Sequence, residues 1–191
     1  MLKQSKQEEA TIRVRTFDWD HAPVTQEKIS NLVFDWDLYP RKEIDHHSVV
    51  QQYAKALEAG VKFPTVKIGL FQGKKIIVDG AHRVRAHSYL KRDTVECSSL
   101  SIESKADLFA ETVRLNSSHG KRFTNVELQD NIKRLRQYRF NVKDISSIVH
   151  VPASEIYREG AAPIAVLITP SGKRIGIGGN APILDAPDVV K

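Results

Sequence analysis

The sequence has a single cysteine, Cys97, among its 191 residues. One thiol excludes an internal disulfide, and it excludes a structural zinc site built from several cysteines. The chain also lacks an apolar run long enough to cross a membrane, and its first ten residues are mostly polar, unlike a signal peptide. These absences lead us to expect a protein of the cytoplasm that makes no membrane contact.

Aromatic residues are also scarce, at 7% of the chain, but a hydrophobic fraction of 41% is enough for a real core. Charged residues make up 27% of the sequence, and the formal net charge is +6. A basic balance of this size permits DNA or another polyanion as a partner without proving one. The length allows one large domain or two small ones.

The most informative stretch joins a predicted strand to a predicted helix at Asp79 and Gly80. Glycine lets the backbone approach a ligand closely, and the first N–H groups of a helix have no partner within that helix. A helix start of this kind favours anions, and Arg83 and Arg85 add planar guanidinium donors that suit phosphate. The pattern predicts an anion site, and the alternative is a strand–helix corner with solvated arginines.

Hydrophobic periodicity predicts an α/β protein: a small domain of strands and helices, then a helical segment and a C-terminal β-hairpin. Gln72-Gly73 is a turn signal between two of the strands, and Thr124 with Glu127 three residues later is a capping box. We divide the chain into an N-terminal extension at 1–37, an α/β domain at 38–122, a helical domain at 123–160, and a hairpin and tail at 161–191.

Two short predicted helices, at 142–149 and 153–158, are separated by three residues. This spacing is typical of a helix-turn-helix, although any small helical bundle can produce it. Basic and polar side chains of this segment are the predicted DNA contacts. They are Arg136, Arg139, Lys143, Ser154, Tyr157 and Arg158.

The order of these motifs resembles the ParB/sulfiredoxin superfamily over residues 38–158. ParB partition proteins carry a Gly-Glu-Arg-Arg-x-Arg-Ala box at a strand–helix corner, and residues 80–86 read Gly-Ala-His-Arg-Val-Arg-Ala. Residues 38–41 are similar to the Pro-x-x-x-Pro-Arg opening of that domain, and residues 58–66 stand where the family has its loop near the nucleobase. Residues 115–119 resemble the third motif, Glu-Asn-x-x-Arg.

The resemblance implies a ParB/sulfiredoxin-like nucleotide-binding domain with a mixed sheet, followed by a helix-turn-helix. In that family the box and the third motif hold the triphosphate of CTP with Mg²⁺, so CTP or ATP with Mg²⁺ is the implied ligand and a homodimer the implied assembly. The implied nucleotide-binding residues are Gly80, Ala81, His82, Arg83, Arg85, Arg114, Asn116, His119, Gly120 and Lys121. Asn116 and Glu111 are the implied metal-binding residues.

This chain departs from the family pattern at the residues that handle phosphate and metal. Leu115 stands where the third motif has its acidic residue, and His82 stands where the box has its first arginine. Glu111, one helical turn before Leu115, is the candidate substitute for the missing carboxylate. These departures bear on CTP specificity and on turnover, so nucleotide hydrolysis is left open.

Three functions are therefore carried forward. The first is a ParB-like DNA-binding protein in which nucleotide binding is coupled to DNA binding or dimerisation. The second is a metal-dependent nuclease or small phosphotransferase, with Asp79, Glu111 and His82 as its catalytic residues. The third is a nucleotide-free DNA-binding regulator of a mobile element. The sulfiredoxin reaction is excluded, because Ala81 stands where that enzyme needs a cysteine.

Overall fold

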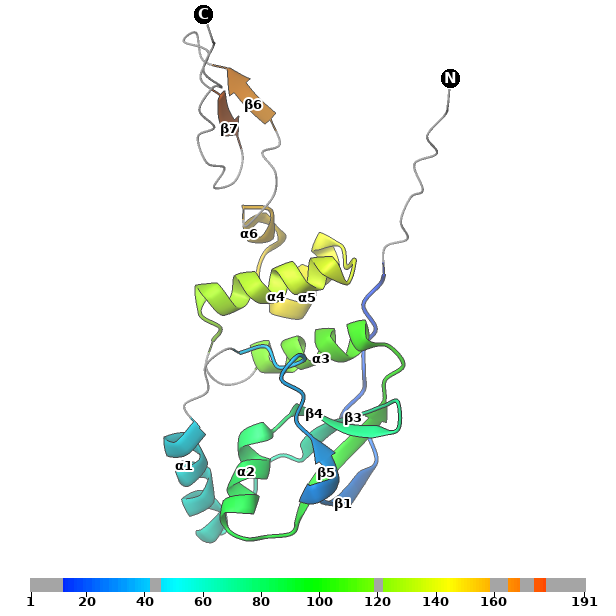
Figure 1. The fold of residues 1–191 in the computed structure, drawn as a ribbon, viewed down its shortest axis with the longest axis vertical. Helices are drawn as coiled ribbons and strands as arrows, with labels where there is room; N and C mark the ends of the chain where they lie inside the picture. The colour runs from blue at the N-terminus through cyan, green and yellow to red at the C-terminus, as the bar shows by residue number, and fades with distance from the viewer. Residues whose placement is uncertain (1–11, 42–45, 119–121, 159–164, 169–173, 178–191) are drawn as a thin grey trace, which may run out of the picture.

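The computed structural model describes residues 12–41, 46–118, 122–158, 165–168 and 174–177, which adopt an α/β fold (Figure 1). The elements, in chain order, are β1 (Val24–Lys28), η1 (Ile29–Asn31), β2 (Leu32–Val33), α1 (His46–Glu58), β3 (Val66–Phe71), β4 (Lys74–Asp79), α2 (Ala81–Tyr89), β5 (Thr94–Ser101), α3 (Lys105–Ser118), α4 (Asn125–Gln137), α5 (Val142–Val149), α6 (Ala153–Arg158), β6 (Ala165–Ile168) and β7 (Arg174–Ile177). Within the described residues, no helix is long and apolar enough to cross a membrane.

The five strands of the main sheet lie in the order β1-β5-β3-β4-β2. The pairs β1–β5 and β3–β4 are antiparallel, whereas β3–β5 and β2–β4 are parallel, so the sheet is mixed as predicted. Its two edge strands both come from residues 24–33, within the segment that the sequence analysis assigned to an N-terminal extension. Strands β6 and β7 pair antiparallel in a separate sheet, which confirms the predicted C-terminal hairpin.

A tight turn and a run of alternating side chains position β4. Gln72 and Gly73 both have positive φ, at 48° and 73°, as a two-residue hairpin turn requires. Along β4, Ile76 and Val78 pack into the cluster that contains α3, while Ile77 packs into the cluster that contains α2. Successive strand residues face opposite sides of a sheet, so this apolar run is buried on both faces and β4 ends between two helices.

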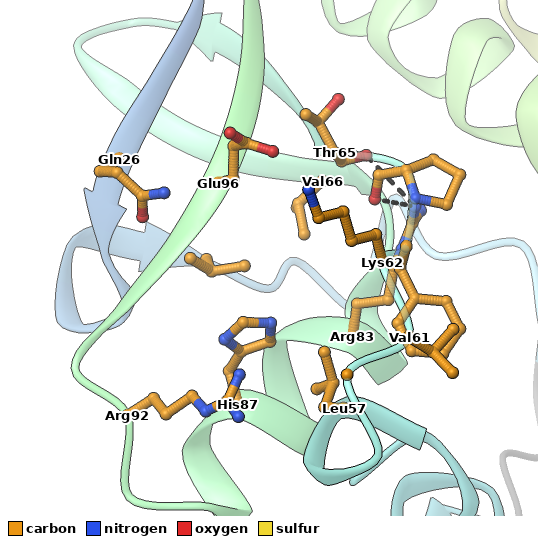
Figure 2. A pocket seen from close by; sticks show the side chains of 14 residues that line it. Gln26, Leu57, Val61, Lys62, Thr65, Val66, Arg83, His87, Arg92 and Glu96 are labelled. Carbon is orange, nitrogen blue, oxygen red and sulfur yellow. Dashed lines mark hydrogen bonds between the residues drawn. The ribbon is translucent and has the colours of Figure 1, made fainter.

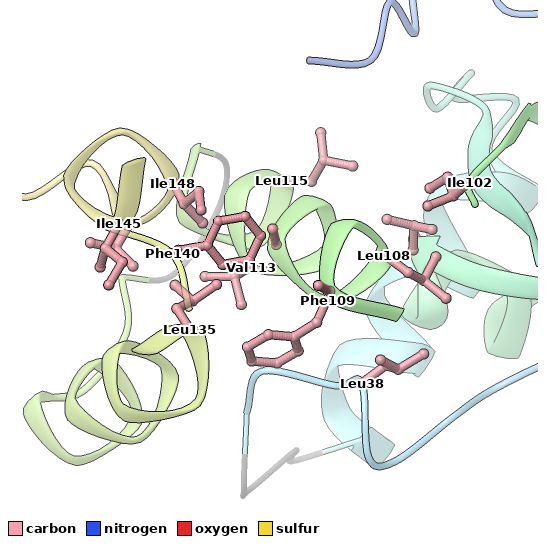
Figure 3. Packing of buried hydrophobic residues seen from close by; sticks show 14 of the residues in the cluster. Leu38, Ile102, Leu108, Phe109, Val113, Leu115, Leu135, Phe140, Ile145 and Ile148 are labelled. Atoms are coloured by element: carbon pink, nitrogen blue, oxygen red, sulfur yellow. The ribbon is translucent and has the colours of Figure 1, made fainter. Parts of the chain in front are cut away.

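Helix α3 joins the sheet to the helical unit, by which we mean α4, α5 and α6. It is buried along most of its length, and it contacts β4 on one side and α4 and α5 on the other. Figure 3 shows Phe109 and Val113 of α3 beside Leu135 of α4 and Ile145 of α5, all in one hydrophobic cluster. The predicted boundary between an α/β domain and a helical domain is therefore crossed by a continuous core.

Gly69 of β3 allows α3 to approach the sheet closely. A Cβ atom at this position would lie 2.5 Å from Leu108 Cδ1 and 3.1 Å from Val78 Cγ2, and all three residues are buried. Because neither neighbour can move into solvent, we expect Gly69→Ala to lower the free energy of unfolding by about 2 kcal/mol. Urea unfolding measures this, and an unchanged midpoint would contradict the close packing of α3 on β3.

Candidate functional site

The predicted strand–helix corner is present, and its geometry depends on Gly80. Strand β4 ends at Asp79, and Gly80 has φ 101° and ψ 19°, a left-handed conformation that glycine adopts without steric cost. Gly80 is the N-cap of α2 and, as a glycine, contributes no side-chain capping bond to the helix start. The first N–H groups of α2 therefore lie at the positive end of the helix dipole, next to a residue that has no side chain.

Arg83 folds back onto this corner. Its Nη1 donates to the carbonyl oxygens of Pro64 at 2.6 Å and Thr65 at 3.2 Å, and its Nη2 bonds Asp79 Oδ2 at 2.5 Å. The Arg83 side chain is only 12% exposed. Arg83 and Asp79, predicted as a phosphate ligand and a catalytic carboxylate, thus brace the corner against the loop that precedes β3.

Two further arginines lie near His82 in the first turn of α2. Burial lowers the pKa of His82, Arg85 and then Arg41 lower it further, and Asp79 acts in the opposite direction. The imidazole stacks on Tyr53 with ring centroids 6.4 Å apart. The Arg85 guanidinium lies 5.2 Å from the centroid of the Phe34 ring. The burial and the two nearby cations thus both disfavour a charge on His82, and the two cations suit an arriving anion.

Arg41 connects this corner to the third motif. Its Nη2 donates to the Asn116 carbonyl oxygen at 3.3 Å, and its Nη1 lies 3.8 Å from Glu127 Oε2. The Asn116 side chain donates from Nδ2 to the Thr112 carbonyl oxygen at 2.8 Å. Arg41 was missed as a site residue, although it belongs to the opening motif quoted for the resemblance. His119, Gly120 and Lys121 lie outside the described residues.

Glu111 and Arg114 bind each other. Arg114 donates from Nε to Glu111 Oε2 at 2.8 Å and from Nη2 to Oε1 at 2.6 Å, and the Trp19 indole also donates to Oε1. Glu111 is 2% exposed, and its hydrogen bonds raise the pKa of Arg114. The two carboxylates predicted to be catalytic, Glu111 and Asp79, are each paired with a different arginine. The described part of the chain contains no group of three or more His, Cys, Asp or Glu side chains placed to hold a metal ion.

A pocket of about 420 Å³ lies next to the corner, and Figure 2 shows the side chains that line it. Its walls come from residues 60–66, α2, β5 and β1, and Arg83 is shared between the pocket and the corner. The pocket is rich in basic groups, which are Lys62, Arg83, His87 and Arg92. Burial lowers the pKa of His87, and its Nδ1 is buried without a hydrogen-bond partner among the described residues. The pocket therefore offers cationic and neutral donors to a polar ligand.

Three of the four predicted DNA contacts whose side chains the structure describes lie on the surface of the helical unit. Lys143 and Ser154 are exposed, and Arg139 is exposed with a positive φ of 66°. Arg136 instead donates from Nη2 to the Ile156 carbonyl oxygen at 2.8 Å, and so ties α4 to α6. The side chains of Tyr157 and Arg158, both in α6, lie outside the described set.

Neither a protein-family profile nor a curated protein sequence matches the chain. Among solved structures, the C-terminally truncated chromosome-partitioning protein ParB from Caulobacter crescentus, complexed to the centromeric parS site, matches with a TM-score of 0.51 at 15% identity, over 69% of this chain and 67% of that chain. The fold is ParB-like. The same ParB complexed with CTP-gamma-S gives a TM-score of 0.44 at 16% identity, over 72% and 76% of the two chains.

Sulfiredoxin from Arabidopsis thaliana also matches, with a TM-score of 0.37 at 14% identity, over 42% of this chain and 88% of that chain. The match to the parS-bound ParB structure confirms the fold that the order of motifs predicted.

Proposed function

We propose that this chain is a ParB-like DNA-binding protein that binds a nucleoside triphosphate, CTP in the first instance, at the Gly80 corner. The observation that carries the proposal is the start of α2 at the left-handed Gly80, where Arg41 and Arg85 lie close enough to His82 to lower its pKa. The N–H groups at a helix start, together with guanidinium groups, form an anion site suited to phosphates. The rest of the nucleotide then extends toward the pocket that shares Arg83.

Mg²⁺ fits this proposal as an ion carried by the triphosphate. It prefers oxygen ligands and usually keeps several waters and phosphate oxygens. Asn116 bonds Thr112 through its amide nitrogen, and that bond does not use its side-chain oxygen. The carboxylates of Asp79 and Glu111 are already paired with arginines. We therefore assign the ion to phosphate oxygens and Asn116, where it would neutralise part of the triphosphate charge.

Arg41 offers a route by which the nucleotide acts on the helical unit. It contacts the Asn116 carbonyl at the end of α3 and Glu127 in the first turn of α4. Asn131 of α4 also donates from Nδ2 to the Pro40 carbonyl oxygen at 3.0 Å. A phosphate that draws Arg41 toward the corner would weaken its hold on Glu127. We propose that nucleotide binding thereby alters DNA binding or homodimerisation in the cytoplasm.

A thermal-shift panel of CTP, ATP and GTP with their diphosphates, with and without Mg²⁺, tests the nucleotide site. A ligand that binds only the folded chain stabilises it by roughly 2.7 kcal/mol at a hundredfold excess over its dissociation constant. We expect Arg85→Ala to weaken the affinity about tenfold or more, because a charged hydrogen bond to phosphate is lost. Lys74→Ala, at the opposite end of β4, removes the same charge and serves as the control.

The absence of a shift with every nucleotide would overturn the nucleotide site. If Arg85→Ala and Lys74→Ala lost nucleotide affinity equally, the loss would be explained by net charge alone and not by a contact with phosphate. Either result would favour the nucleotide-free DNA-binding regulator.

The DNA-binding part of the proposal rests on the exposed basic surface of α5 and the residues before it. The ParB structure that shares this fold was determined with parS DNA. If Lys143 neutralises one phosphate, we expect Lys143→Ala to reduce the slope of log affinity against log salt concentration by about one. Titrations at several salt concentrations measure this slope. Lys55→Ala in α1 is the control, and equal slopes for the two variants would contradict the assignment.

A further inference from the structure

Residues 12–22, which we call the N-terminal strap, run from the helical unit past α3 to the start of β1 (Figure 1). At the outer end, Ile12 donates its N–H to the Arg139 carbonyl oxygen at 3.2 Å and forms an isolated bridge with Phe140. Val14 donates its N–H to Asp144 Oδ2 at 3.4 Å. The strap therefore touches the junction of α4 and α5 and the first turn of α5.

The middle of the strap is attached to α3 and the residues just before it. Arg15 pairs through Nη1 with Glu103 Oε2 at 2.6 Å, and its Nε lies 3.9 Å from Asp107 Oδ2. One turn further along α3, the indole of Trp19 donates to Glu111. Trp19 is only 7% exposed and belongs to the main hydrophobic cluster.

The attachment weakens from the sheet outward. At the inner end, Ser99 donates its N–H to the Pro23 carbonyl oxygen at 3.1 Å, and β1 then pairs with β5 along five residues. At the outer end Ile12 is 39% exposed, and the Arg15–Glu103 pair is exposed by 57% and 74%. Val14 packs against the main hydrophobic cluster but is only partly buried, and the other outer contacts are exposed ion pairs and isolated backbone bonds. Such contacts open more readily than a sheet ladder or a buried tryptophan.

The outer contacts of the strap are made with the part of the helical unit that we propose binds DNA. The carbonyl of Arg139 accepts the Ile12 N–H, and Asp144, which accepts the Val14 N–H, follows Lys143 in sequence. The same Asp144 carboxylate accepts a 2.8 Å bond from Asn141 Nδ2, while Asn141 Oδ1 accepts the Asp144 N–H and caps α5. The strap is thus bonded to the start of the first predicted DNA-binding helix.

We propose that the N-terminal strap is an autoinhibitory latch: its outer part, residues 12–16, holds α5 against α3 and must detach before the helical unit engages DNA fully. The proposal rests on the proposed DNA-binding function. Trp19 and β1 keep the inner part of the strap in place, so opening is local and reversible. The loss of an outer contact therefore increases DNA affinity, although Arg15 itself is cationic.

The latch is tested by comparing the DNA affinities of Arg15→Ala and Arg13→Ala in the full chain. Both variants remove one positive charge, but only Arg15 contacts Glu103 and Asp107. Net charge alone lowers DNA affinity equally in both. The latch predicts that Arg15→Ala binds DNA at least threefold more tightly than Arg13→Ala. Ile12→Pro, which removes the N–H bonded to Arg139, is expected to tighten binding in the same way.

Hydrogen–deuterium exchange of the same proteins separates the latch from the DNA-binding proposal. We expect faster exchange in residues 12–19 and in the first turn of α5 for Arg15→Ala and Ile12→Pro, with β4 unchanged. Faster exchange in the strap alone would overturn the latch, and a loosened α5 with DNA affinity equal to that of Arg13→Ala would overturn autoinhibition. If no variant bound DNA, the proposed function and autoinhibition would both fall, and exchange would still show whether the strap holds α5.

Discussion

Glu111→Ala is expected to lower the free energy of unfolding by about 3 kcal/mol, because it breaks a buried ion pair from one side. Glu111 is 2% exposed and accepts hydrogen bonds from Arg114 and Trp19. Without the carboxylate, the Trp19 indole loses its acceptor inside the core, and the Arg114 guanidinium loses both of its bonds to Glu111. Urea unfolding followed by tryptophan fluorescence measures the change.

Glu103→Ala is the matched control for this prediction. Glu103 also pairs with an arginine, but both partners are largely exposed, so we expect no measurable change in stability. A Glu111 variant as stable as the wild type would mean that its carboxylate is hydrated and open to metal. That result would revive the nuclease or phosphotransferase reading, which needs a carboxylate with access to Mg²⁺.

Gly80→Ala is expected to weaken nucleotide binding by about tenfold or more and to destabilise the chain. A Cβ atom at this position would lie 2.8 Å from Arg83 Nη2 and 2.9 Å from Arg83 Nε, at a φ of +101°. The left-handed backbone alone costs a side chain about 1–2 kcal/mol. Displacement of Arg83 would also release Asp79 and the Pro64 carbonyl, so the start of α2 would lose its shape.

Gly73→Ala is the control for the cost of placing a side chain on a left-handed backbone. Gly73 has φ +73°, and a Cβ atom added there would meet no atom within 4 Å, so its substitution adds strain without crowding. Thermal melts and nucleotide titrations of both variants separate the two effects. Gly80→Ala should lose nucleotide affinity while Gly73→Ala keeps it. Unchanged affinity in Gly80→Ala would place the phosphates away from this corner.

Local chemistry explains why much of this fold was predictable. The Gln72-Gly73 turn, the Thr124–Glu127 capping box and the Gly80 corner each depend on residues a few positions apart, and all are present. The resemblance to ParB proteins predicted how these local elements follow one another along the chain, and the observed fold confirms that prediction. The two edge strands at residues 24–33 were not predicted, because short, mostly exposed strands carry little hydrophobic alternation.

The sequence by itself determined the strand–helix corner, the helix starts and the chemistry of the side chains placed there. Only the tertiary structure decided their partners. Arg83 bonds the loop before β3, Glu111 bonds Trp19 across 92 positions of sequence, and Arg41 reaches Asn116 across 75. A side chain's type states which bonds it can form, but long-range packing selects among the available partners. The same arginine and carboxylate types therefore serve as braces at one point of the fold and as candidate ligands at another.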